Sequence, residues 1–220
     1  FNMTNNASSG WRVTMASLAQ NGTSAATFSY GANGTWTVTG AAATVAGQIL
    51  GPWATIGGQN SIANQTDYAI INGSASIAAR NIAGSAETTW TTAANAYTMS
   101  ANQTLTATRT ITALRNTFAT TPQLTLASGA NLETYGVLNG AANATLTIAP
   151  GTGGALTTPS GGGNLYLTMG PGGTGVAGGI TVSAPINNNS GNVTLVKNGT
   201  GILTLSSTSS NYSGGTVINA

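Results

Sequence analysis

The sequence contains no cysteine, no histidine and very few charged residues. Without histidine and cysteine, the chain lacks the commonest general base, the thiol nucleophile and the usual zinc ligands, so a Ser-His-Asp triad is excluded. The absence of cysteine fits a protein that crosses a cell envelope before folding, and it also fits many cytosolic chains. We therefore predict no catalytic, cofactor-binding or metal-binding residues, and no cofactor.

Charged residues make up 4% of the chain, against roughly 25% in an ordinary soluble domain. The basic residues are scattered, so no patch can neutralise several phosphates and we predict no nucleic-acid partner. They are Arg12, Arg80, Arg109, Arg115 and Lys197. No apolar run approaches the roughly 18–20 residues of a membrane-spanning helix, so we predict no transmembrane segment. Abundant β-branched residues argue against disorder and favour a folded chain.

Three carboxylates remain for acid–base chemistry: Asp67, Glu87 and Glu133. Glycoside hydrolysis needs two carboxylates about 5–10 Å apart, so Asp67 and Glu87 are the pair to weigh as a polysaccharide-cleaving site. The favoured interpretation is that both are solvated or paired with Arg80. For Glu133 we expect a surface or coil-to-coil contact, with Arg109 or Arg115 as the partner.

Short stretches of alternating apolar and polar residues recur between clusters of glycine, asparagine and serine. Residues 35–39, 123–127, 145–149 and 165–169 are such stretches, and in the last one Leu165, Leu167 and Met169 share a face opposite Tyr166 and Thr168. The alternation predicts strands. Helical signals are weak even over residues 61–79, where β-branched side chains and Gly73 oppose a helix. The chain is therefore predicted to be all-β.

Glycine clusters separate these strands, for example at residues 151–154, 161–163 and 170–173. A phosphate-binding loop would need a helix after it, and a calcium-binding β-roll would need repeated aspartate, so we interpret the clusters as turns. Short strands with glycine-rich corners favour a β-solenoid, whose narrow core accepts small side chains. A β-sandwich subunit of a surface filament is the alternative, because sandwiches also use short strands.

The end of the sequence carries a specific motif. Residues 197–206 read KNGTGILTLS and residues 211–220 read NYSGGTVINA. They closely resemble the autotransporter-associated β-strand repeat, Lys-x-Gly-x-Gly-x-Leu-x-Leu-Ser followed by Asn-x-Tyr-x-Gly-Gly-Thr-x-(Val/Ile)-Asn-Ala. The motif predicts that Leu203 and Leu205 point inward, that Tyr212 caps a corner, and that Gly214 or Gly215 has a positive φ.

A looser similarity to large secreted proteins with this repeat extends over the preceding region, at residues 51–58, 67–69, 111–115, 124–129 and 136–138. The resemblance implies a right-handed parallel β-helix and a protein exported to the extracellular space or the bacterial cell surface. The extent of the resemblance divides the chain into two parts. Residues 1–50 are expected to form an N-terminal β segment that serves as a cap or an inter-subunit strand. Residues 51–220 are expected to form a β-solenoid domain that ends in the repeat at about 192–220. Because the repeat usually continues into another strand, we expect its last coil to be completed by a longer chain or by residues 1–20 of another subunit.

Three functions follow as hypotheses. The leading one is a non-catalytic structural or adhesive surface module that self-associates into a fibre, sheath or stalk. The second is a carbohydrate-binding or host-adhesion module that uses exposed tryptophan and tyrosine side chains. For the tryptophans we favour packing in the core or a cap: Trp11, Trp36, Trp53 and Trp90. The third is a polysaccharide-active enzyme that uses Asp67 and Glu87.

Asn-x-Ser/Thr sequons are unusually abundant. They begin at Asn2, Asn6, Asn21, Asn33, Asn64, Asn72, Asn102, Asn143, Asn188, Asn192, Asn198 and Asn211. We interpret asparagines of this kind as ladders along the corners of a solenoid, with glycan attachment as the alternative.

Overall fold

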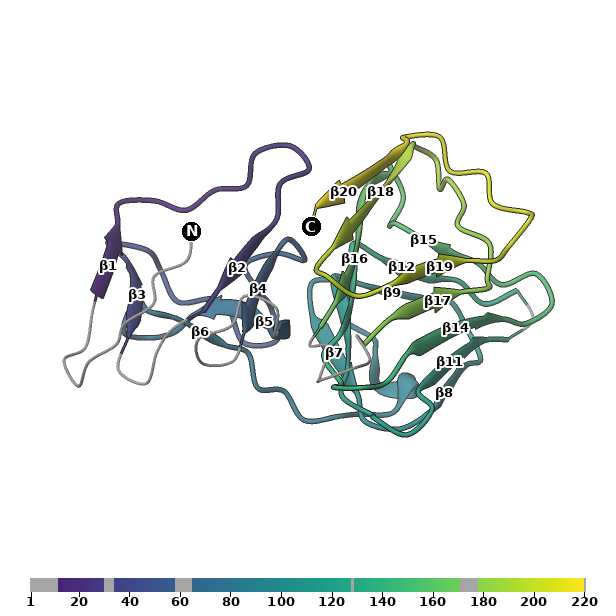
Figure 1. Ribbon diagram of the computed structural model, residues 1–220, viewed down its shortest axis with the longest axis horizontal. Coiled ribbons are helices and arrows are strands. Elements are labelled where there is room, and N and C mark those ends of the chain that lie inside the picture. The colour runs from purple at the N-terminus through teal and green to yellow at the C-terminus, as the bar shows by residue number, and fades with distance from the viewer. Residues whose placement is uncertain (1–11, 30–33, 58–64, 128, 171–177, 220) are drawn as a thin grey trace.

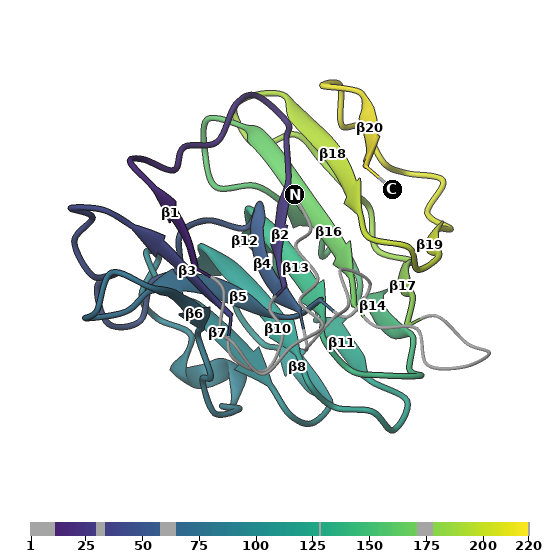
Figure 2. The ribbon, with the colours of Figure 1, turned by 60° about the vertical axis from the view of Figure 1, so that its left-hand side comes forward.

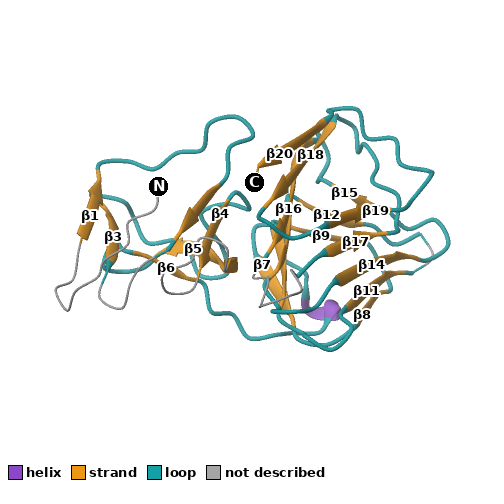
Figure 3. Ribbon diagram, in the orientation of Figure 1, coloured by secondary structure: helices purple, strands orange, loops and turns teal. Residues whose placement is uncertain are grey.

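The computed structural model describes residues 12–29, 34–57, 65–127, 129–170 and 178–219. Within these residues the regular structure is almost entirely β-strand, and the only helix described is the single 3-10 turn η1 (Glu87–Thr89) (Figure 3). The all-β prediction is therefore confirmed. Trp11, Asn2, Asn6, Asn33 and Asn64 lie outside the described residues.

Most strands belong to three parallel sheets that form the three sides of a stack of coils. The six-stranded sheet consists of β7 (Ala96–Met99), β10 (Ala113–Asn116), β13 (Gly136–Asn139), β16 (Gly163–Met169), β18 (Val193–Asn198) and β20 (Thr216–Asn219). The five-stranded sheet consists of β8 (Gln103–Leu105), β11 (Gln123–Leu126), β14 (Leu146–Pro150), β17 (Ile180–Val182) and β19 (Leu203–Leu205). The three-stranded sheet consists of β9 (Arg109–Ile111), β12 (Leu132–Thr134) and β15 (Leu156–Thr157).

The chain visits these sheets in turn, and each strand pairs in parallel with its counterpart one coil further on (Figure 1). Leu114 pairs with Val137, and Val137 pairs with Leu167. This arrangement is a parallel β-solenoid, as predicted. The sandwich alternative would need mainly antiparallel pairing between its strands.

The core of the solenoid is a column of aliphatic side chains that the strand alternation directs inward. Leu124 and Leu126 of β11 are fully buried, and so are Leu165, Leu167 and Met169 of β16. Asparagine joins this column at one corner. There Asn116 Nδ2 donates to Asn139 Oδ1 over 2.9 Å, and both side chains are buried.

A second body, formed by residues from the first part of the chain, packs beside the solenoid (Figures 1 and 2). Its strands are β1 (Arg12–Met15), β2 (Ala26–Phe28), β3 (Thr35–Val38), β4 (Ala54–Gly57), β5 (Gln65–Ile71) and β6 (Ile77–Ala79). We call it the N-terminal body. Phe28, Trp36, Ile56 and Ile71 are among the residues of its own small core.

The sheet topology divides the chain at a different point from the domain boundary expected from the sequence. Strands β4, β5 and β6 pair antiparallel with one another, so they do not join the stack, which begins at β7. The domain boundary predicted from the sequence, between residues 50 and 51, stays a prediction. In the structure, the strands within residues 54–79 lie in the N-terminal body and not in the stack of coils.

The N-terminal body covers the outer face of the six-stranded sheet. Ile49 and Tyr68 pack against Ala96, Ala113 and Leu138 of that sheet. Small residues allow this close approach, since a Cβ on Gly136 would lie 2.5 Å from Pro52 Cβ. The outer face of this sheet is therefore a second buried layer.

Tyr166 and Thr168 show the consequence of this packing. They lie opposite the inward residues of β16, as predicted, yet both are buried. Tyr166 Oη accepts a hydrogen bond from the Gln20 side chain and donates to the Ser24 carbonyl over 3.3 Å. Polar groups of the N-terminal body thus replace water on this face.

Candidate functional site

The last coil holds the repeat motif, and its geometry follows from its glycines. Gly199 and Gly215 have φ of 84° and 83°, in the left-handed region that glycine adopts without strain. A Cβ on Gly214 would lie 2.7 Å from the Val193 carbonyl oxygen, so this position requires glycine for close packing. The prediction of a positive φ at Gly214 or Gly215 is confirmed at Gly215.

Tyr212 closes the third corner of this coil. Its ring packs against the solenoid core and its hydroxyl lies 3.1 Å from Thr216 Oγ1. The backbone N–H groups of Asn211 and Tyr212 both donate to the Ile186 carbonyl of the coil before. The prediction that Tyr212 caps a corner is confirmed.

The strands at the end of the stack expose apolar side chains. Ile202 is 70% exposed, Ile218 68% and Leu205 44%. By register, Leu205 follows Ile148 and Val182, and Ile218 follows Val137, Leu167 and Lys197. Ile148, Val182, Val137 and Leu167 face inward in the coils below, whereas Lys197, the direct partner of Ile218, is half-buried. Leu205 and Ile218 are exposed because no described strand lies over β19 or β20.

The sequence prediction for Leu203 and Leu205 is thus refined. Leu203 packs against the core, as expected. Leu205 occupies an inward position but keeps almost half of its surface in contact with solvent. We call the exposed group of Ile202, Leu205 and Ile218 the apolar end.

Asp67 and Glu87 are each held in a separate ion pair. Asp67 Oδ2 lies 2.9 Å from Arg115 Nη1 and Asp67 accepts hydrogen bonds from the backbone N–H groups of Tyr68 and Asn81. Burial raises the pKa of Asp67, while Arg115 and these N–H groups act in the opposite direction. Glu87 lies 2.7 Å from Arg109 Nη2 and accepts a hydrogen bond from Thr106.

This arrangement does not suit a pair of hydrolytic carboxylates. Both side chains are buried, and the space around Asp67, between Arg80 and Arg115, has no room for a water molecule. The partner expected for both acids, Arg80, instead donates to the Gly47 and Ala96 carbonyls. The arginines that neutralise the two acids come from later strands, β9 and β10.

The predicted partner of Glu133 was wrong. Its carboxylate accepts hydrogen bonds from Thr110 Oγ1 at 2.7 Å and from Asn189 Nδ2 at 3.2 Å, while Arg109 and Arg115 are engaged by the other two acids. The contact is coil-to-coil, as expected, because Thr110 and Glu133 are register partners on β9 and β12.

The tryptophans described by the structure are packed. Trp36 and Trp90 are 3% and 1% exposed, and Trp36 contacts Phe28 edge to face. Trp53 is partly buried against the core of the N-terminal body. The expectation of core packing is confirmed for Trp36 and Trp90, so they form no exposed sugar-stacking surface.

Asparagine side chains link successive coils at the corners, as interpreted from the sequence. Asn102 and Asn211 are sequon residues whose side-chain oxygens accept from the Gln123 and Asn188 backbone N–H groups of a neighbouring coil. The buried pair of Asn116 and Asn139 lies outside the sequons. Sequon content was therefore an incomplete guide to the asparagines that stabilise the stack.

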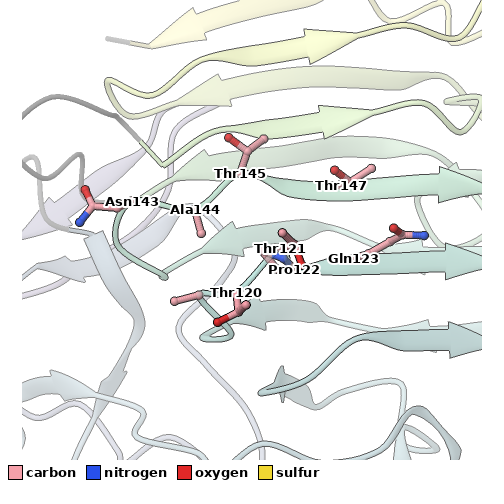
Figure 4. Close-up of a pocket in the computed structure, with 9 residues that line it drawn as sticks. Thr120, Thr121, Pro122, Gln123, Asn143, Ala144, Thr145 and Thr147 are labelled. Carbon is pink, nitrogen blue, oxygen red and sulfur yellow. The ribbon is translucent and has the colours of Figure 1, made fainter.

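A groove of about 530 Å³ lies where the chain turns from the six-stranded to the five-stranded sheet (Figure 4). Its lining is uncharged and contains no aromatic ring: Ala119, Thr120, Thr121, Pro122, Gln123, Asn143, Ala144, Thr145 and Thr147. Thr121 and Asn143 have φ of 45° and 58°, which is uncommon for residues other than glycine. The groove offers neutral hydrogen-bonding groups and no acid–base pair.

Metal-ligand clusters and membrane-spanning helices are both absent from the described part of the chain. It contains no group of three or more histidine, cysteine, aspartate or glutamate side chains arranged to hold a metal ion. It also contains no helix long and apolar enough to cross a membrane.

Residues 195–220 match the family model described as passenger-associated-transport-repeat. The match coincides with β18, β19, β20 and the apolar end, and it confirms the resemblance to the autotransporter-associated repeat. Such a repeat implies a secreted or surface-exposed protein. No curated protein matches the chain significantly, and no solved structure does so either.

Proposed function

We propose that the chain is a non-catalytic structural module of the cell surface or extracellular space, and that its apolar end associates with a second copy of the chain to build a fibre, sheath or stalk. This proposal rests mainly on one observation, that Ile202, Leu205 and Ile218 are exposed together on the last coil. Apolar surface of this kind favours association because burial removes it from water.

The backbone supports the same proposal. β19 and β20 are the outermost strands of their sheets, and each pairs with one neighbour only among the described residues. An unpaired strand edge is a template for another strand. A parallel strand from another copy would satisfy these backbone groups and cover Leu205 and Ile218 in one step.

Low charge makes this association easier. None of the charged residues lies in β19 or β20, and Lys197, the register partner of Ile218 on β18, donates its Nζ to the Gly199 carbonyl, so little like-charge repulsion opposes contact at this end. Head-to-tail contact between copies propagates into a filament when the rotation between copies does not close into a ring.

The test is the assembly state of the full chain. Sedimentation velocity and negative-stain images of the purified protein are expected to show concentration-dependent assemblies, and Ile218→Lys and Ile202→Lys are expected to reduce them. Val45→Lys is the matched control, because Val45 is 64% exposed but lies in the N-terminal body. A wild-type chain that stays monomeric at all concentrations, or equal effects of all three substitutions, would overturn the proposal.

A further inference from the structure

A pocket of about 230 Å³ lies in the N-terminal body, apart from the apolar end and from the groove of Figure 4. One wall is the turn at residues 44–48, and the other consists of Ile70 of β5 together with Arg80 and Ile82, just after β6. We call this cavity the Arg80 pocket. Its lining combines one cation with aliphatic side chains, so its chemistry differs from that of the uncharged groove.

The Arg80 guanidinium has no acidic partner. The three acids of the chain are held by other residues, and Arg80 forms no ion pair with any of them. It donates only from Nη2, to the backbone carbonyls of Gly47 and Ala96. Nη1 makes no hydrogen bond to a described residue, and Nε is buried without a partner. The charge of Arg80 is therefore not compensated by the protein.

The surroundings of Arg80 carry a net positive charge. Asp67 is the acid that acts on Arg80, and it is already paired with Arg115, so two guanidinium groups share one carboxylate. Burial has the largest effect on the pKa of Arg80 and lowers it, while Asp67 acts in the opposite direction. A partly buried cation without a counter-ion is unfavourable, and an anion beside it reduces this cost. The pocket is therefore suited to a ligand with one negative charge.

The remaining walls of the pocket are aliphatic and neutral. Val45 is 64% exposed, and in the described part of the chain it is the only large apolar side chain exposed outside the apolar end. Ile70 and Ile82 are half-buried. The Gln48 amide also lines the pocket and makes no hydrogen bond to another described residue. A hydrocarbon chain that covers these aliphatic side chains is stabilised by removal of apolar surface from water.

The turn at residues 44–48 is held in place by the protein itself. Gly47 has a φ of 93°, which glycine adopts without strain. Its carbonyl accepts from the Ala96 N–H over 2.9 Å as well as from Arg80, and a Cβ at this position would collide with the Asn95 side chain. Because the turn is fixed, a ligand does not have to order it on binding.

We propose that the Arg80 pocket binds an aliphatic monocarboxylate. The carboxylate accepts hydrogen bonds from Arg80 Nη1 and the Gln48 amide, and the hydrocarbon chain lies against Val45, Ile70 and Ile82. A phosphate group carries more charge than a single guanidinium compensates, and the lining has no aromatic ring to stack on a sugar. A free short-chain acid and the C-terminal aliphatic residue of a peptide share this chemistry. The binding is separate from the structural function proposed above and uses a different surface.

The first experiment titrates the isotope-labelled full chain with hexanoate and follows the backbone amide resonances by NMR. Saturable shifts are expected for residues of the Arg80 pocket. Hexanamide, which lacks the charge, and acetate, which lacks the hydrocarbon chain, are each expected to bind at least about tenfold more weakly. N-acetyl-leucine represents a peptide C terminus, so the tighter of this compound and hexanoate identifies the source of the carboxylate. The proposal is overturned if hexanoate causes no saturable shift, if hexanamide binds as tightly, or if inorganic phosphate binds more tightly than both acids.

A charge at the mouth of the pocket gives the sharper test. Val45→Glu and Val45→Gln introduce side chains of the same shape at an exposed position, where neither is expected to disturb the fold. The carboxylate in Val45→Glu repels the ligand and can pair with Arg80 itself, so hexanoate is expected to bind at least about tenfold more weakly than to Val45→Gln. Arg80→Gln is expected to abolish binding, whereas Arg12→Gln, at an exposed position of β1, retains it. Circular dichroism checks the fold of each variant. Equal affinities of Val45→Glu and Val45→Gln, or full binding by Arg80→Gln, would overturn the proposal.

Discussion

Asp67 of β5 and Arg115 of β10 form a 2.9 Å ion pair that joins the N-terminal body to the solenoid. Both side chains are largely removed from solvent, at 4% and 15% exposure. The same contact region contains the hydrogen bond from Tyr68 Oη to the Leu114 carbonyl at 3.2 Å. The docking of the two bodies thus depends on polar groups that are satisfied only when the bodies are together.

The first prediction is that Arg115→Met destabilises the protein by about 3–5 kcal/mol, because it leaves the Asp67 carboxylate buried without its cation. Urea unfolding followed by circular dichroism measures the change. The double variant Asp67→Asn/Arg115→Met is expected to recover part of the loss, since no uncompensated charge remains. Arg12→Met, at an exposed position of β1, serves as the control. Equal stability of the wild type and Arg115→Met would contradict this role of the ion pair.

The second prediction concerns pH. Burial raises the pKa of Asp67 above its ordinary value of 3.8, and this effect outweighs the nearby Arg115 and backbone N–H groups. The folded state therefore binds more protons at this carboxyl than the unfolded state. The free energy of unfolding then falls as the pH rises from about 3.8 through the raised pKa.

Asp67→Asn isolates this contribution, because the other titrating groups are unchanged. The stability of the wild type relative to Asp67→Asn is expected to be highest below pH 3.8 and to decrease toward neutral pH, at no more than about 1.4 kcal/mol per pH unit. Urea titrations at several pH values measure the difference. A difference that grows as the pH rises would show that ion pairing outweighs burial at Asp67.

Local alternation was enough to predict the strands and their inward faces. Leu124 and Leu126 were assigned to one face of a strand from sequence, and both are fully buried in β11. The glycine pair at 214–215 was likewise assigned from the motif, and Gly215 has the expected positive φ. These features depend on residues that are close together in the sequence, so they can be predicted from the sequence alone.

Contacts between distant segments could not be predicted in this way. Arg115 was not assigned to Asp67, because nothing in the local pattern connects β5 with β10. The burial of Tyr166 depends on Ser24 and Gln20, which are far away in the sequence. Sequence alternation specifies which face of a strand a residue occupies, but not whether another body covers that face.

The register between coils could not be predicted for a related reason. The coils differ in length, since Thr147 aligns with Gln123 on one side and with Thr181 on the other at unequal sequence separations. The columns of stacked side chains therefore have no fixed period. A sequence search could have found only the repeated outward threonines of separate strands, without their register.

The third prediction tests the corner of the repeat. Gly215→Val is expected to cost about 1–2 kcal/mol, because a β-branched residue is strained at a φ of 83°. Gly215→Asn is expected to cost less, since asparagine tolerates this conformation better. Thermal unfolding compares the variants. Equal melting temperatures for the wild type and Gly215→Val would show that the left-handed turn is absent in solution.

The last prediction concerns the buried asparagines of the solenoid. Asn139 Nδ2 donates to the carbonyl oxygens of Ala144 and Gly179 at 2.7 and 2.8 Å, while its Oδ1 accepts from Asn116. Asn139→Asp keeps the shape of the side chain but places a carboxylate oxygen against two carbonyl oxygens. It is expected to destabilise the protein more than Asn139→Ala, which should cost about 1–3 kcal/mol by leaving these buried groups unsatisfied. Asn143→Asp, at an exposed position of the neighbouring corner, is the control. Urea unfolding at pH 7 ranks the three variants, and an Asn139→Asp protein as stable as the control would mean that Asn139 does not hold the two coils together.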